Sequence, residues 1–317
     1  MGGTRAGIKI KGLGKSRGQR AVSNDELAQI VDTSDEWIRE KSGIRSRYFA
    51  DKKTNEDMAA EAAAEALANA GVDVEDVDIC IVCTFTPDDF TPAIACNVAG
   101  RVGLKENIFA FDLNGACAGF IYGCNIANGL LAGMGKDEKH YALVVGSEKI
   151  SPLMDMGDRS TCVLFGDGAG AAVLEYDENA DFAFTGGCSS NKDILYCSRE
   201  NTAIKMAGQE VYRFAVSKVP TAIKKIMADT GCTDKDIDYF VCHQANERII
   251  DNAARRITKD TDKFYKNLYS YGNTSAASIP LALSDMEEEG LLKEGCRLIC
   301  TGFGAGLTYG SMLITRG

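Results

Sequence analysis

The nine residues from Gly71 to Ile79 read GVDVEDVDI, and the nine from Gly231 to Tyr239 read GCTDKDIDY. Each stretch begins with a glycine after a predicted helix, and glycine readily adopts the left-handed conformation that ends helices. Each then passes through two aspartates, separated by one aliphatic residue, into an apolar run that predicts a strand. Because the two stretches lie about half a chain length apart, they indicate that the chain contains one helix–turn–strand unit twice.

Two further pairs of segments repeat at a comparable spacing, so chance similarity of one short unit does not explain the pattern. A predicted helix begins at Cys117 after an apolar strand, and another begins after Asn273 in the same way. The predicted strand at 169–174 has a counterpart at 307–314. We therefore predict an α/β fold built from two pseudo-symmetric βα halves.

One cysteine occupies a position typical of a nucleophile. The segment 114–120 reads NGACAGF and places Cys117 between the predicted strand 108–113 and a helix of small residues. A thiol at a helix N-terminus is exposed to unpaired N–H groups and to the positive end of the helix dipole, which favour the reactive thiolate. The alternative is that Cys117 is a small buried apolar residue, as many cysteines are. The strand–glycine–cysteine–helix context favours the nucleophile.

Two residues of the second half can complete a site with this cysteine. A change from apolar to charged and small residues places the halves at residues 1–176 and 177–317. Cys117 belongs to the first half, whereas His243 and Asn273 belong to the second. His243 follows a predicted strand, and functional side chains often lie at the carboxyl ends of strands in α/β sheets. Cys, His and Asn together suggest acyl transfer through a covalent thioester, in a cleft between the halves.

The remaining cysteines and histidines do not form a pattern typical of a metal site. Cys80 and Cys83 are three residues apart in a predicted strand, where such positions point to opposite faces. His140 and His243 are the only histidines, and no pair of CxxC motifs occurs. We therefore predict that the protein holds no metal and no permanently bound cofactor.

Composition restricts the classes of function further. The formal net charge of −10 is unfavourable for general nucleic-acid binding. No run of about 18 apolar residues occurs, so no membrane-spanning segment is predicted. Residues 1–6 lack the apolar core of a secretion signal, and the 12 cysteines indicate reduced thiols. We therefore expect a cytoplasmic protein that binds neither nucleic acid nor membranes.

The order of the motifs along the chain is more specific than any one of them. They are VDTSDEWI at 31–38, GIR at 43–45, NGACAGF at 114–120, FGDGAGAAVL at 165–174, HQAN at 243–246, GNTSA at 272–276 and GFGAG at 302–306. With these motifs, the chain resembles β-ketoacyl-acyl-carrier-protein synthase III, a family of the thiolase superfamily, over nearly its whole length.

The resemblance implies a thiolase-like α/β fold of five layers, ordered αβαβα, and a decarboxylative Claisen condensation. Cys117 would take the acyl group of an acyl-coenzyme A starter, and coenzyme A would leave. A malonyl group on acyl carrier protein would then lose carbon dioxide, and the resulting carbanion would attack the thioester. The product would be 3-oxoacyl-acyl carrier protein, which initiates fatty acid biosynthesis.

The resemblance also assigns a role to each residue of the site. His243 and Asn273 would donate hydrogen bonds to the malonyl thioester oxygen, where enolate charge develops. The backbone N–H groups of Cys117 and Ala305 would bind the acyl oxyanion. The family often has glycine at the position of Ala305, and a backbone donor tolerates alanine there if φ is negative.

Coenzyme A requires an aromatic platform and cations, which four residues would provide by resemblance. Trp37 would stack on the adenine, with Arg159 on the opposite face and Thr33 hydrogen-bonded to the base. Lys41 stands where the family commonly has arginine, so it retains the charge but lacks the planar fork of a guanidinium. Without the resemblance, Trp37 would equally well be a partly buried anchor.

Two surface features indicate protein partners. The segment 245–257 predicts a helix whose arginines lie on a different face from its apolar residues. By resemblance the chain forms a homodimer, and Phe90 would cross the interface into the acyl pocket of the partner; the alternative for Phe90 is a loop anchor. Acyl carrier proteins are acidic, so we expect a docking surface, rather than an ordinary solvated face, formed by Arg248, Arg255, Arg256 and Arg213.

Three other functions are alternatives to a condensing enzyme. A papain-like thiol hydrolase also uses Cys, His and Asn in this order, but the chain lacks its CG(S/A)C(W/Y) signature. A non-enzymatic scaffold would have lost the nucleophile or the histidine, and this chain retains both. A related ketosynthase or acyltransferase of secondary metabolism is the alternative that the sequence separates least, and the preferred starter chain is not indicated.

Overall fold

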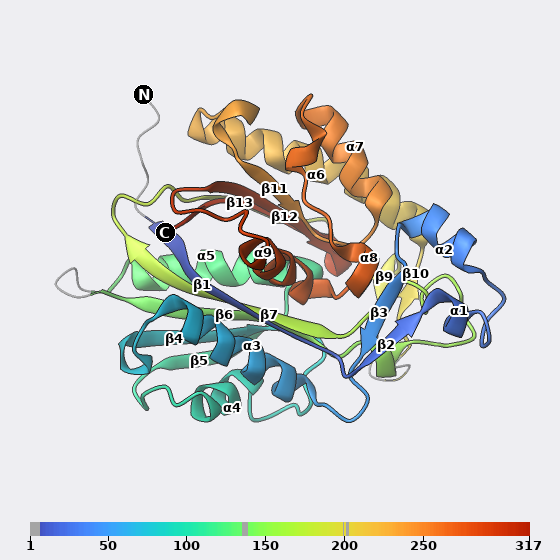
Figure 1. Ribbon diagram of the computed structural model, residues 1–317, viewed down its shortest axis with the longest axis horizontal. Helices are drawn as coiled ribbons and strands as arrows, with labels where there is room; N and C mark the ends of the chain where they lie inside the picture. Colours follow the sequence, from blue (N-terminus) through green and yellow to red (C-terminus); the bar gives the residue numbers. More distant parts are fainter. Residues whose placement is uncertain (1–6, 135–138, 199, 201–202) are drawn as a thin grey trace.

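The chain folds into alternating layers of helix and sheet (Figure 1). A computed structural model describes residues 7–134, 139–198, 200 and 203–317. Residues 1–6, for which no secretion signal was predicted, lie outside this range.

The first half of the chain forms one mixed sheet with the strand order β5–β4–β6–β7–β1. Strands β5, β4 and β6 are parallel, whereas β7 is antiparallel to both β6 and β1. The strands are β1 (Gly7–Arg17), β4 (Val77–Cys83), β5 (Phe109–Leu113), β6 (Tyr141–Glu148) and β7 (Gly168–Asp177).

The second half repeats this arrangement in the order β11–β12–β13–β8. Strands β11 and β12 are parallel, and β13 is antiparallel to both β12 and β8, so the order matches β4–β6–β7–β1 position for position. Strand β1 also pairs with β13, which joins the two sheets. The strands are β8 (Ala183–Cys188), β11 (Tyr239–Cys242), β12 (Arg297–Gly304) and β13 (Thr308–Arg316).

Six helices form three layers around the two sheets (Figure 1). Helices α3 and α4 cover the outer face of the first sheet, α5 and α9 pack between the sheets, and α6 covers the outer face of the second sheet with α7 against it. The three largest apolar clusters fill the spaces between these layers. The helices are α3 (Asn55–Ala70), α4 (Ile94–Arg101), α5 (Gly119–Leu131), α6 (Gly208–Thr230), α7 (Glu247–Ile257) and α9 (Ser278–Glu288).

The predicted duplicate unit occurs in both halves. Gly71 and Gly231 end α3 and α6 with φ of 61° and 72°, in the left-handed region that glycine tolerates. Each is followed by a short 3₁₀ turn, Val74–Asp76 or Asp234–Asp236, and then by β4 or β11. The predicted boundary between the two halves, at residues 176 and 177, falls at the end of β7. This division into halves stays a prediction.

Small residues allow the helices to approach the sheets closely. A Cβ atom on Gly14 of β1 would lie 2.3 Å from backbone atoms of Ala62 and Ala66 in α3. Ala62 and Ala66 are fully buried, so larger side chains at these positions would separate the helix from the sheet. The alanine-rich sequence of α3 is therefore explained by the distance between two layers.

A subdomain of short elements lies beside the carboxyl ends of the central strands (Figure 1). The buried guanidinium of Arg47 ties it to the body of the protein by donating to the Val163 carbonyl at 2.7 Å and to Asn24 Oδ1 at 2.8 Å. The short elements are β2 (Arg20–Ser23), α1 (Asn24–Leu27), α2 (Asp35–Ser42), β3 (Ser46–Phe49), β9 (Leu195–Tyr196), β10 (Lys205–Met206) and α8 (Leu268–Tyr271).

A helix that crosses a membrane is both long and continuously apolar. In the part of the chain that the structure describes, none of them combines the length and the apolar character needed to cross a bilayer.

Candidate active site

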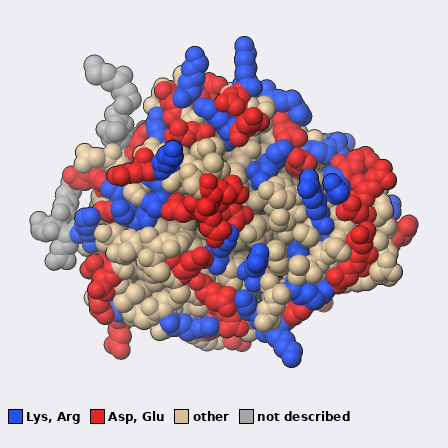
Figure 2. Space-filling model, viewed as in Figure 1, with Lys and Arg blue, Asp and Glu red and all other residues tan. Residues whose placement is uncertain are grey.

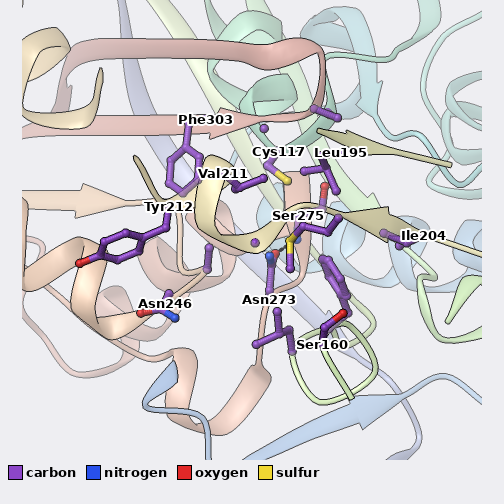
Figure 3. A pocket seen from close by; sticks show the side chains of 18 of the residues that line it. Cys117, Ser160, Leu195, Ile204, Val211, Tyr212, Asn246, Asn273, Ser275 and Phe303 are labelled. Carbon is purple, nitrogen blue, oxygen red and sulfur yellow. Dashed lines mark hydrogen bonds between the residues drawn. The ribbon is translucent and has the colours of Figure 1, made fainter. Parts of the chain in front are cut away.

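One cavity of about 950 Å³ lies between the two halves and contains the predicted nucleophile. Trp37 and Cys117 line it from the first half, and His243 and Asn273 line it from the second. Figure 3 shows Cys117, Asn273 and Ser275 around this space, with Phe303 and Tyr212 on another wall. The structure therefore brings the three predicted catalytic residues together, although they come from distant parts of the sequence.

Cys117 lies at a sharp turn between β5 and α5. Ala116 has a φ of 47°, and its N–H donates to Asn114 Oδ1 at 3.2 Å, which reverses the chain and starts a 3₁₀ turn at Ala116–Ala118. The end of β12 packs against this turn, because a Cβ atom on Gly304 would lie 2.7 Å from the Cys117 nitrogen. Glycine at 304 therefore leaves room for Cys117, which is 9% exposed.

The protonation state of Cys117 differs from the expectation based on the helix dipole. Burial raises the pKa of the thiol to about 12, and the Ser275 hydroxyl and the backbone N–H of Cys117 lower it by less. The backbone N–H therefore acts in the direction expected for a helix N-terminus, but burial has the larger effect and favours the neutral thiol.

His243 presents a neutral ring to the cavity. It follows β11, its backbone N–H donates to the Thr301 carbonyl at 2.8 Å, and it is 1% exposed. Burial lowers its pKa to about 3, so the imidazole is uncharged near neutral pH.

The neighbours of His243 indicate which ring nitrogen carries the proton. Nδ1 lies 2.6 Å from Ser278 Oγ, and the same oxygen accepts a 3.4 Å bond from the Gln244 N–H. Ser278 can then use its own proton to donate to Nδ1, which leaves the ring proton on Nε2. With this tautomer, His243 can donate a hydrogen bond from Nε2.

Asn273, like His243, presents a hydrogen-bond donor to the cavity. Its backbone N–H donates to the Leu164 carbonyl at 2.8 Å, and its Oδ1 accepts a 2.9 Å bond from the Ser275 N–H. Because the oxygen is engaged with the backbone, the amide NH₂ group remains to donate into the cavity. His243 and Asn273 thus supply two neutral donors, the arrangement required to stabilise a developing negative charge.

The proposed second oxyanion donor also lines the cavity. Ala305 begins the 3₁₀ turn Ala305–Leu307 that follows β12, next to the Gly304 that packs on Cys117. Its φ is not positive, so alanine is accommodated there without strain.

The predicted coenzyme A residues lie mainly at one end of the cavity. Trp37, Lys41 and Arg159 line it, whereas Thr33 does not. The Arg159 guanidinium lies 5.0 Å from the centre of the Trp37 ring and donates to the Asp32 carbonyl at 2.9 Å. Arg159 thus stacks directly on the aromatic platform, in the position where the adenine was expected.

Thr33 and Lys41 differ in their surroundings. The Thr33 hydroxyl is shielded from solvent, and among the described residues it has no hydrogen-bond partner. Lys41 forms an ion pair of 2.6 Å with the neighbouring Glu40 on the exposed surface of α2. The buried hydroxyl is a potential donor to a ligand, and the exposed ion pair is a weak interaction that a phosphate can displace.

The predicted docking arginines lie on two adjacent helices, α6 and α7. Arg213 of α6 and the three arginines of α7 are exposed, and Arg248 also lines the cavity. Arg248 stacks on Tyr212 at 5.6 Å, and Arg256 donates to the Val216 carbonyl at 2.9 Å. Acidic side chains are interspersed with basic ones over these helices in Figure 2, so the surface is mixed in charge.

Several residues that contact the site were not singled out by the sequence. Phe303 packs its ring edge-on against His243 with 5.2 Å between ring centres. Ser278 and Ser275 stand in the second half where Gly119 and Ala116 stand in the first, and both Ser275 and Ala116 have positive φ. The internal repeat was therefore the signal that could have identified them. Cys197 is a second cysteine lining the cavity.

A metal site requires several ligating side chains close together in space. Within residues 7–134, 139–198, 200 and 203–317, the structure contains no group of three or more His, Cys, Asp or Glu side chains that could hold a metal ion. Cys80 and Cys83 are buried in β4 as free thiols, in agreement with their interpretation as strand residues.

Sequence comparisons connect this site with known proteins. Family models for 3-oxoacyl-(acyl-carrier-protein) synthase III match residues 111–189 and, for the C-terminal part, residues 227–316. A β-ketoacyl-(acyl-carrier-protein) synthase III of Clostridium acetobutylicum is 42% identical over 322 aligned residues, which cover 97% of this chain and 98% of that protein. The similarity therefore extends over the whole cavity.

Comparison of structures gives the same result. The crystal structure of 3-oxoacyl-(acyl-carrier-protein) synthase III from Aquifex aeolicus aligns with a TM-score of 0.92 at 38% identity, covering 97% of this chain and 99% of that one. The crystal structure of a priming β-ketosynthase from a polyketide biosynthetic pathway aligns with a TM-score of 0.91 at 34% identity, covering 98% of this chain and 97% of that one. The predicted fold and resemblance are confirmed, and the chain belongs to the β-ketoacyl-acyl-carrier-protein synthase III family of enzymes, with its thiolase-like fold.

Proposed function

We propose that the protein condenses an acyl-coenzyme A starter with malonyl-acyl carrier protein to give 3-oxoacyl-acyl carrier protein, the first condensation of fatty acid biosynthesis. The convergence of Cys117, His243 and Asn273 on one cavity is the observation that carries this proposal. The cysteine can hold the acyl group as a thioester, and the two donors face the space that a second thioester would occupy.

Each half-reaction uses a different part of the site. In the first, the Cys117 sulfur attacks the acyl carbon, and the backbone N–H groups of Cys117 and Ala305 stabilise the oxyanion until coenzyme A leaves. In the second, His243 and Asn273 donate to the malonyl thioester oxygen while carbon dioxide departs. The carbanion then attacks the acyl-Cys117 thioester and releases the nucleophile. Neutral donors suit this step, because charge develops on oxygen only in the transition state.

Coenzyme A occupies the end of the cavity lined by Trp37, Lys41 and Arg159. Arg159 stacks on Trp37 in the structure, so we expect it to move aside and close on the second face of the adenine. The buried hydroxyl of Thr33 gains a partner if the base reaches it, and Lys41 supplies charge to a phosphate. In this proposal the enzyme works without a bound metal or a permanent cofactor.

The proposal includes a homodimer in the cytoplasm. Strand β5 is the last strand of its sheet, and Phe109 at its start is 62% exposed. Phe90, in the loop after β4, is also strongly exposed, at 82%. An interface along β5 would cover both residues and allow Phe90 to reach the partner's acyl pocket.

The proposed reaction is tested by two successive additions. Incubation with acetyl-coenzyme A should add one acetyl group to the protein in an intact mass spectrum, and the peptide containing Cys117 should carry it. Subsequent addition of malonyl-acyl carrier protein should remove the label and yield acetoacetyl-acyl carrier protein. A protein that hydrolyses the thioester, or that transfers acetyl without carbon–carbon bond formation, would contradict the proposal.

A ketosynthase that primes a polyketide is the second candidate, because a structure of that type aligns over 98% of this chain. The two candidates share the chemistry and differ in the carrier protein and the starter. Competition between fatty-acid and polyketide carrier proteins, with a series of acyl-coenzyme A starters, distinguishes them. The papain-like alternative is not supported, because the fold and the family are those of condensing enzymes.

We expect the arginines beside the cavity to select the acidic carrier protein. Charge reversal of Arg248 and Arg256 to glutamate should raise the Michaelis constant for malonyl-acyl carrier protein by about tenfold or more and flatten its salt dependence, because steering by opposite charges is lost. Acetyl transfer from coenzyme A to Cys117 should change much less. Lys225→Glu, at an exposed ion pair of α6 outside the cavity lining, is the control for a charge reversal elsewhere on this surface. Equal losses in both half-reactions would assign these arginines to coenzyme A or to structure.

A further inference from the structure

A buried arginine that the proposed condensation does not use lies against the segment that carries Asn273. Arg47 of β3 is fully buried. Its guanidinium donates to the Val163 carbonyl at 2.7 Å, to Asn24 Oδ1 at 2.8 Å and to the Val22 carbonyl at 3.3 Å. All three acceptors are neutral, and among the described residues the Nε atom has no partner. A cation buried at such a cost is expected where its geometry serves the site.

An isolated bridge, rather than a regular sheet, holds Asn273 in place. Its N–H donates to the Leu164 carbonyl at 2.8 Å, and its carbonyl accepts a 3.1 Å bond from the Gly166 N–H. These two bonds form the parallel bridge between Phe165 and Asn273. The position of the Asn273 side chain therefore depends on the backbone of residues 163–166, and a shift of that backbone would carry the donating amide with it.

The side chain of Arg47 packs on both segments of this bridge. A Cβ atom on Gly166 would lie 3.0 Å from the Arg47 Cβ, and a Cβ atom on Gly272, the residue before Asn273, would lie 3.2 Å from it. The guanidinium at the other end of the side chain holds the Val163 carbonyl. Arg47 thus contacts the bridge at a glycine of each segment and ties the first segment down by a hydrogen bond.

The directions of the acceptors explain why this residue is an arginine. Nη1 serves Asn24 in the subdomain of short elements, while Nη2 serves Val163 in the body of the protein. A guanidinium offers donors in fixed directions, whereas a lysine ammonium is a single point charge on a flexible stem. Lysine can therefore retain the charge at position 47 but cannot hold the acceptors on both sides in the same geometry.

The coenzyme A side of the cavity is held by other contacts. Helix α2 is tied down by the Asn24 amide group, which donates to Asp35 Oδ1 and to the Ile44 carbonyl at 2.8 Å each. A change at Arg47 leaves these donors and acceptors in place. We therefore expect acylation of Cys117 to depend much less on Arg47 than the enolate donor does.

We propose that Arg47 is a positioning residue for the second half-reaction, an inference that rests on the proposed function. By holding the Val163 carbonyl, its guanidinium fixes the bridge from which Asn273 presents its amide to the malonyl thioester. Arg47 is not among the residues that line the cavity, so it acts through Asn273. A misplacement on the order of 1 Å is enough to slow a reaction about 10²-fold.

The test is a double-mutant cycle on protein that has first been acetylated on Cys117. Single-turnover condensation with malonyl-acyl carrier protein is measured for the parent, Arg47→Lys, Asn273→Ala and the double variant. Arg47→Lys should slow this step about tenfold or more, whereas its acetylation by acetyl-coenzyme A should stay within about threefold of the parental rate. Because Arg47 acts through Asn273, Arg47→Lys should have little further effect once residue 273 is alanine.

Hydrogen exchange provides a readout that does not depend on activity. The N–H groups of Asn273 and Gly166 form the two bonds of the bridge, and both should exchange faster in Arg47→Lys than in the parent. The N–H groups within β6 should keep their parental rates. Arg20→Lys, the same substitution at an exposed ion pair of the neighbouring strand β2, is the control and should match the parent in every measurement.

The proposal is overturned by parental condensation or parental bridge exchange in Arg47→Lys, by an equal loss of acetylation, or by an undiminished effect in the Asn273→Ala background. If Arg47→Lys does not fold, Arg47→Gln enters the same cycle, because it removes the buried charge and keeps one donating NH₂ group. The parent protein judges the proposed function separately. An acetylated parent that forms no 3-oxoacyl product refutes the condensation, whereas additive losses with an active parent refute only the role of Arg47.

Discussion

Cys117→Ser should abolish the covalent acyl-enzyme and lower overall condensation on the order of 10⁴-fold or more, the loss typical when a nucleophile that acts with its partners is removed. A serine hydroxyl is far less acidic than a thiol, and the buried position that already keeps the thiol protonated penalises an alkoxide even more. The measurement is intact mass after incubation with acetyl-coenzyme A, together with the rate of 3-oxoacyl product formation.

The cavity supplies a matched control for this experiment. Cys197 is the other cysteine that lines it, so it is the alternative acceptor of the acyl group. Cys197→Ser should still form the acyl-enzyme, with the label on the Cys117 peptide. Persistent acetylation of the Cys117→Ser protein, or loss of acetylation in Cys197→Ser, would show that the nucleophile has been assigned to the wrong residue.

His243→Ala and Asn273→Ala should each slow decarboxylation and condensation on the order of 10²-fold or more, while acylation of Cys117 from acyl-coenzyme A survives in part. Both side chains are buried donors whose other polar atoms are engaged, so each deletion removes one hydrogen bond to the developing enolate. Product formation from a protein already acylated on Cys117 isolates this step from the first half-reaction.

A substitution that preserves the local fold sharpens the result for the asparagine. Asn273→Asp keeps an oxygen to accept the bond from the Ser275 N–H but replaces the donating NH₂ with a second acceptor. It should therefore be at least as impaired in condensation as Asn273→Ala, with an unchanged thermal transition. Condensation at the parental rate by any of these variants would remove the residue concerned from the enolate site.

The sequence was sufficient to predict the fold because the signals that carry it are local and occur twice. The glycines at 71 and 231 end helices by their own conformational freedom, and the strands that follow are recognisable from apolar runs. Cys117 was likewise predicted as the nucleophile from its neighbours in the chain, since a strand, a tight turn and a helix of small residues are consecutive there. Chemistry that depends on consecutive residues can be predicted before the chain is folded.

The protonation state of Cys117 could not be predicted in this way. The helix N-terminus is visible in the sequence and favours the thiolate, whereas the burial that opposes it depends on β12 and on the turn at Ser275, both far away in the chain. The tautomer of His243 depends similarly on Ser278, and the position of Arg159 on Trp37 depends on how two separate segments pack.

By itself, then, the sequence determined the repeated unit and predicted which side chains react, because propensity, periodicity and turn chemistry act over a few residues. Only the tertiary structure decided which proton each of them holds. The parallel pairing of β4 with β6, for example, brings Thr84 and Thr86 to the buried carboxylate of Glu148. Desolvation and hydrogen bonding set these proton affinities, and both are produced by contacts between residues that are remote in sequence.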